Sequence, residues 1–352
     1  MANDKKIASY RYRFVDALRG LAIVLMVINH TARYWLSFHP NQLIYFTMIF
    51  SGPLFLFLVG FSLALSYRQK TERQYFNHFK IIKKYFWRAI GLMIIGYVLS
   101  LALYGPAEMF RGRVLQSIAW CIILLLPWLK WTRTAAGRIS GLIFSLSWLF
   151  ILPLFFAPLR SWVDGQPLIA YLFFSDYAPL YYFALPLLGL ILGNWFLEFK
   201  QQPQKIISHL RIFLLAAAAC FFIGINAVLR YADPVIGKNI FWRDFILNNY
   251  WLPRSDTLFL ILGYIGLVGA AAYYLFEIKK IRFKAAEILG QASLMVYCLH
   301  LLLVYRFARI LLGVSLSNRP VYWLLNILLI IILYVCARIW PDIKSKVIKL
   351  KK

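Results

Sequence analysis

The chain has 352 residues, of which 62% are hydrophobic and only 15% are charged, and this composition excludes an ordinary soluble globular protein. Its formal net charge of +26 would suit nucleic acid, but the basic residues are distributed as at a membrane surface, so we expect membrane lipid and no nucleic acid as a partner. The chain is therefore predicted to be a polytopic integral membrane protein.

Ten hydrophobic segments approach the roughly 20 residues needed to cross a bilayer core of ~30 Å. They predict an all-α bundle of about ten transmembrane helices in a single domain, residues 1–352, with tails at 1–12 and 341–352. The fourth segment is the shortest. The expected spans are 14–36, 42–66, 86–104, 114–129, 138–158, 177–197, 210–230, 255–276, 288–312 and 321–340.

The Lys and Arg residues predict the orientation of the bundle. If the amino terminus is cytoplasmic, 27 of the 39 basic residues lie on the inner side, 11 lie on the outer side, and Arg19 falls within the first span. This is the asymmetry expected from the positive-inside rule. Both termini are therefore predicted to be cytoplasmic.

The first span, "RFVDALRGLAIVLMVINHTARYW", carries Asp16, Arg19 and His30. Charged groups cost roughly 2.5 to 3.5 kcal/mol each at mid-bilayer and usually face the interior of a bundle. Their helical spacing places them on one stripe. Because a helix rises about 1.5 Å per residue, His30 is expected roughly 21 Å along the axis from Asp16, near the outer surface, with Asp16 and Arg19 near the inner one.

Arginine residues gather on the predicted outer side, where the positive-inside rule disfavours them. Snorkelling and ion pairing could account for any single one. Together they favour a site for a phosphate or carboxylate ligand, since guanidinium groups bind such anions bidentately. The candidate substrate-binding residues on this side are Arg33, Arg111, Arg113, Gln116, Asp176, Arg254 and Arg306.

His30 is the candidate catalytic residue of this outer group, although a structural role is the alternative. An imidazole with an unperturbed pKa of about 6.5 can accept a proton from an amine or hydroxyl at neutral pH. Asn29 precedes His30, and a carboxylate such as Asp256 could fix its tautomer. His300 shares a polar stripe with Ser293 and Tyr297 in the ninth span. It is expected either to hydrogen-bond between helices or to line a tunnel toward His30.

Metal and nucleotide-hydrolysing chemistry lacks sequence support, because the chain has no C-x-x-C, H-E-x-x-H, G-x-G-x-x-G or P-loop pattern. The four cysteines fall within predicted spans and are expected to be reduced thiols. We therefore expect neither a metal nor a tightly bound cofactor.

Several segments occur in the order found in a known family. These are "VDALRGLAIVLMVINH", "GPLFLFLVGFSLALS", "RGRVLQSIAW", "DYAPLYYFALPLLGLILG", "YWLPRSDTLFLILGYIGL" and "LGQASLMVYCLH". Together they cover most of residues 13–305, and the chain resembles a bacterial-type member of the heparan-α-glucosaminide N-acetyltransferase family, within the transmembrane acyltransferase superfamily.

The resemblance implies an enzyme of the bacterial inner membrane that passes an acyl group, typically acetyl from acetyl-CoA as co-substrate, to the amine or hydroxyl of a glycan or amino sugar. It implies His30 as the catalytic histidine, as general base or acyl carrier, with His39 as the alternative. Asn29 and Gln116 are candidate donors to the carbonyl oxygen. Arg19 is a candidate donor-binding or gating residue. A homodimer is compatible with the family.

Two other function classes remain open at this point. A transporter or flippase would use Asp16, Arg19, His30 and His300 as a transmembrane polar path, but the chain lacks obvious inverted repeats. A structural or sensory membrane component without chemistry is the weaker alternative.

The asymmetric distribution of Lys and Arg predicts which loops lie on the outer side of the membrane, and this topology can be tested. Reporter fusions after residues 40, 110, 165, 240 and 316 should all report the outer side of the membrane. A cytoplasmic signal at two or more of these sites would contradict the predicted orientation.

Overall fold

The computed structural model describes residues 11–37, 41–72, 77–110, 112–155, 162, 166–175, 177–199, 203–231 and 255–350. Within these ranges the chain is helical and its only β feature is one isolated bridge between Leu36 and Leu316. Among the described residues, eight helices are long and apolar enough to cross a membrane, and two shorter apolar helices accompany them. The predicted all-α polytopic membrane bundle is thus confirmed.

The helices follow the predicted spans closely. The main ones are α1 (Arg13–Trp35), α2 (Asn41–Thr71), α3 (His78–Tyr104), α4 (Val114–Leu125), α5 (Trp128–Trp131), α6 (Ala135–Ile151), α8 (Pro167–Phe174), α9 (Pro179–Tyr182), α10 (Ala184–Phe199), α11 (Pro203–Tyr231), α12 (Ser255–Tyr273), α13 (Lys284–Gln291), α14 (Ser293–Leu301) and α15 (Arg319–Leu350). Two π-helical stretches, Tyr274–Ile278 and Leu302–Leu311, extend α12 and α14.

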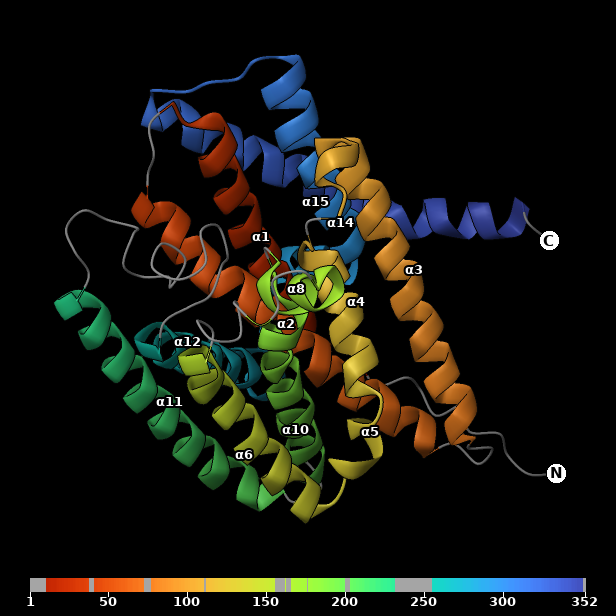
Figure 1. Ribbon diagram of the computed structural model, residues 1–352, viewed down its shortest axis with the longest axis vertical. Helices are drawn as coiled ribbons and strands as arrows, with labels where there is room; N and C mark the ends of the chain where they lie inside the picture. The colour runs from red at the N-terminus through yellow and green to blue at the C-terminus, as the bar shows by residue number, and fades with distance from the viewer. Residues whose placement is uncertain are drawn as a thin grey trace.

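Several predicted spans differ from the structure in their bounds, and the third, predicted from residue 86, begins at His78. The fourth ends at Leu125, before Pro127, because proline and the residue preceding it disfavour continuation of a helix. The ninth is broken at Ala292, where α13 gives way to α14. The last continues through Pro341, so residues 341–350 of the predicted tail extend this helix, and this end of α15 projects from the bundle (Figure 1).

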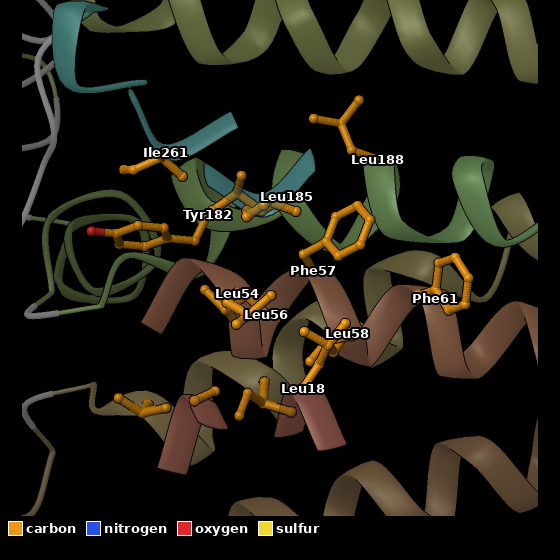
Figure 2. Packing of buried hydrophobic residues seen from close by; sticks show 14 of the residues in the cluster. Leu18, Leu54, Leu56, Phe57, Leu58, Phe61, Tyr182, Leu185, Leu188 and Ile261 are labelled. Carbon is orange, nitrogen blue, oxygen red and sulfur yellow. The ribbon is translucent and has the colours of Figure 1, made fainter. Parts of the chain in front are cut away.

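The centre of the bundle is formed by α1, α2 and α10, with α3 and α4 on one flank and α11 with α12 on the other (Figure 1). Figure 2 shows the apolar side chains that fill this centre, including Leu18 of α1, Phe57 and Leu58 of α2, and Leu185 and Leu188 of α10. In a bilayer this contact depends on close packing, because lipid tails are as apolar as the side chains themselves.

Glycine allows the central helices to approach closely. A Cβ atom on Gly60 of α2 would overlap the carbonyl of Pro186, and one on Gly189 of α10 would overlap the carbonyl of Phe57. The same holds between α1 and α13, where Gly20 faces Ala286 and Gly290 faces the carbonyl of Asp16. Small residues at such contacts are the usual device of membrane helix packing.

The amino-terminal end of α1 is held by charged groups. The Glu277 carboxylate accepts hydrogen bonds from the backbone N–H groups of Arg13 at 2.8 Å and Phe14 at 3.4 Å, where the helix dipole favours negative charge. Buried Asp16 pairs with Arg11 at 2.5 Å and with Arg19 at 3.6 Å.

Arg19 also donates to Ser62 of α2 at 2.5 Å. Its contacts with Asp16 and Ser62 give Arg19 an anchoring role between α1 and α2, at the end of α1 opposite His30.

The glycine contacts can be tested with a matched pair of variants. Gly60→Ala should destabilise the protein by about 1 to 3 kcal/mol, because the new methyl group overlaps the backbone of α10. Gly91→Ala is the control, since a Cβ at that helical position meets nothing within 4 Å. The unfolding midpoints of both variants are measured in detergent, with size-exclusion chromatography after heating to detect the folded protein that remains. Equal midpoints for the two variants would contradict the packing argument.

Candidate active site

A polar cavity opens at the end of the bundle where α1 ends and α4 begins. It contains about 640 Å³ of space not filled by protein atoms, including the part that is open to the outside. Its walls come from the last turns of α1 and α3, the start of α4, the residue Tyr177, and α14. The lining residues are Asn29, His30, Arg33, Tyr34, Gly96, Leu99, Ser100, Leu103, Tyr104, Arg113, Val114, Leu115, Gln116, Tyr177, Tyr297 and Leu301.

Two histidines from distant parts of the chain meet at this cavity. The Nδ1 atom of His30 lies 2.9 Å from the Nε2 atom of His300, and the two ring centroids are 5.1 Å apart. The other nitrogen of His300, Nδ1, lies 3.1 Å from the backbone carbonyl oxygen of Val296. His300 is fully buried. It is therefore a direct partner of His30 rather than a residue further along a tunnel.

Tyrosines form one wall beside the histidines. The hydroxyl groups of Tyr34 and Tyr104 lie 3.2 Å apart, and Tyr305 places its ring centroid 4.8 Å from Tyr34 and 4.9 Å from Tyr104. The His30 ring lies nearly parallel to that of Tyr34, at 6.3 Å. These tyrosines were not among the residues predicted from the sequence, although Tyr34 follows His30 by one helical turn, a spacing that indicates a shared face.

Arg113 brings positive charge to the cavity. Its guanidinium lies 3.6 Å from the centre of the Tyr104 ring, and its Nη2 atom is 3.4 Å from Glu108. Its Nε atom is buried and has no hydrogen-bond partner among the described residues. Arg33 lines the same cavity from α1. Two arginines at one cavity suit an anionic ligand, because guanidinium groups bind phosphate and carboxylate strongly.

Two side-chain amides complete the polar lining. Gln116 is fully buried, and its Nε2 donates to Ser100 at 3.1 Å. Its Oε1 atom has no hydrogen-bond partner among the described residues. Gln116 therefore presents an acceptor at the cavity, and the donor role expected from the sequence stays a prediction. Asn29 donates one N–H to Thr47 at 3.3 Å.

The other candidates from the sequence are not at the cavity or lie outside the described residues. Arg306 is exposed and does not line the cavity. Arg111, Asp176, Arg254 and His39 lie outside the described residues, as does the side chain of Asp256. Among the residues that are described, no group of three His, Cys, Asp or Glu side chains could hold a metal ion.

A family model and two known proteins that resemble this chain all indicate the same family. A family model described as "Heparan-alpha-glucosaminide N-acetyltransferase, catalytic" matches residues 11–245, more than half of the chain. The mouse (Mus musculus) heparan-alpha-glucosaminide N-acetyltransferase is 31% identical over 138 residues, which are 36% of this chain and 21% of the mouse protein. The human (Homo sapiens) protein is 34% identical over 110 residues, 30% of this chain and 16% of the human protein. The matched segments thus span less than a quarter of either relative.

The arginine placement predicts a kinetic effect. Arg113→Ala should raise the KM for an anionic substrate about ten-fold while changing kcat less, because a charge-assisted hydrogen bond is lost on binding. Arg309→Ala is the control, since Arg309 is exposed and does not line the cavity. An unchanged KM in Arg113→Ala would assign this residue to helix packing through Tyr104.

Proposed function

The chain belongs to the heparan-α-glucosaminide N-acetyltransferase family, and from that premise we propose that it is an integral-membrane acyltransferase. The observation that supports this most directly is the meeting of His30, Arg113 and Gln116 at one polar cavity within a bundle of apolar helices. A base, an anion-binding group and a hydrogen-bond acceptor at one cavity suit acyl transfer.

The proposed reaction moves an acetyl group from acetyl-CoA to the amine or hydroxyl of a sugar. His30 accepts the proton of the attacking N–H or O–H while the new bond to the carbonyl carbon forms. The CoA thiolate then leaves and recovers that proton as a thiol. Transient acetylation of His30 is the two-step alternative, and His39 is the alternative base.

The surrounding groups have distinct proposed roles. Arg33 and Arg113 bind the phosphate groups of the donor or an acidic group of the acceptor. The carbonyl oxygen of Gln116 accepts a hydrogen bond from the attacking group. Asn29, which lines the cavity, is the proposed donor to the oxygen that becomes negative, a contribution that is typically about 100- to 1000-fold in rate. The proposed location is a bacterial inner membrane with both termini cytoplasmic.

The structure weighs against the transporter alternative. Between Asp16 and His30, the stripe of α1 passes through Ile23 and Met26, which are buried among apolar side chains. A transported polar substrate needs a polar or hydrated path. Polar groups here are instead gathered at the two ends of α1, which favours chemistry at one end.

The direct test is acetyl transfer by the purified protein in detergent, with radiolabelled acetyl-CoA and a panel of amino sugars. Transfer of label to one acceptor class is expected. Absence of transfer to every acceptor, with uptake of a labelled anion by proteoliposomes instead, would favour the transporter.

Single variants then test the base. His30→Ala should lower kcat at least about 100-fold, as loss of a general base typically does, without loss of folded protein. His39→Ala should cost less. The reverse order of the two effects would move the catalytic assignment to His39.

A further inference from the structure

The hydrogen bonds around the two histidines determine which nitrogen of His30 can accept a proton. A neutral imidazole carries one N–H, and its other nitrogen is an acceptor. The backbone carbonyl of Val296 can only accept, so His300 must donate to it from Nδ1 at 3.1 Å. The Nε2 atom of neutral His300 is then an acceptor.

The acceptor on His300 in turn determines the proton position on the His30 ring. The Nδ1 atom of His30 lies 2.9 Å from this acceptor, so Nδ1 of His30 must carry the proton. The carbonyl of Met26, one turn earlier on α1, is a second acceptor at the His30 ring. The contact with His300 therefore favours the tautomer of His30 in which Nδ1 is protonated and Nε2 carries a lone pair.

We infer that His300 is a positioning residue that fixes His30 in this tautomer, so that Nε2 of His30 is the atom that takes the proton from the acceptor. This inference rests on the proposed function for its kinetic consequence. The tautomer itself follows from the contacts of the two rings. His300 has the role that the sequence predicted for a carboxylate such as Asp256, which is to fix the tautomer of His30. Its neutral ring orients His30 without bringing a second charge into the bundle.

Burial makes this arrangement specific. The side chain of His300 is exposed to neither lipid nor water, and its ring contacts His30 and Tyr297. An unpaired ring nitrogen in such surroundings would cost free energy, since buried polar groups need a partner. The two histidines therefore have one arrangement of protons that satisfies their mutual hydrogen bond, and this arrangement leaves Nε2 of His30 as the nitrogen that can accept a proton.

A matched pair of variants separates positioning from packing. In His300→Gln the side-chain amide places a hydrogen-bond acceptor near the former Nε2 atom. In His300→Asn the shorter amide reaches only the former Nδ1 position, next to Val296. Both are polar and of similar volume, so a merely structural role of His300 predicts similar activity for the two.

We expect His300→Gln to retain most of kcat and His300→Asn to lose at least about five-fold in kcat, with the KM for acetyl-CoA unchanged in both. Equal kcat values in two folded variants would overturn the positioning role. Both proteins are first compared with the wild type by size-exclusion chromatography.

Nuclear magnetic resonance of the ¹⁵N-histidine-labelled wild type, at about pH 8 where ordinary imidazoles are neutral, reads the tautomer without any substrate. A protonated Nδ1 and an unprotonated Nε2 on His30 would support the inference. A protonated Nε2 on His30 would overturn it. If this tautomer is found but the wild type transfers no acetyl group, the proposed function fails and the tautomer stands.

Discussion

Inside a bilayer, a polar group without a partner in the protein is costly, and the rest of this structure depends on that constraint. Along α1 the chain meets it by placing the polar side chains near the two ends of the helix and apolar groups along the length between them. At one end, Asp16 is neutralised by Arg11 and Arg19. At the other end, His30 and His300 bond to each other.

The contact between the two histidines depends on how closely α1 packs against α13, the helix that precedes α14. Gly20 of α1 and Gly290 of α13 allow the backbones of these helices to touch. The chain then turns at Ala292 into α14, which carries His300 toward the end of α1 where His30 lies. A larger residue at either glycine would separate the helices, and the two imidazole rings would move with them.

The cavity combines groups that are costly to place in a membrane. The buried Nε atom of Arg113 and the buried Oε1 atom of Gln116 both lack a hydrogen-bond partner among the described residues. Such groups normally reduce stability, so their presence at a cavity favours a role in binding a polar ligand. The tyrosines around Arg113 reduce that cost, since a guanidinium stacks favourably on an aromatic face.

The sequence by itself determined that this is a multi-span helical membrane protein and which segments form its helices, because hydrophobicity summed over about 20 residues is a strong signal. It also separated Asp16 from His30, since helical rise is fixed by local geometry. It could not bring His300 to His30, because 270 residues separate them and no local pattern records how closely α1 and α13 approach. The direction in which Gln116 presents its amide was likewise decided by Ser100 on a neighbouring helix. Partners across helices depend on tertiary packing, and only the folded bundle decides them.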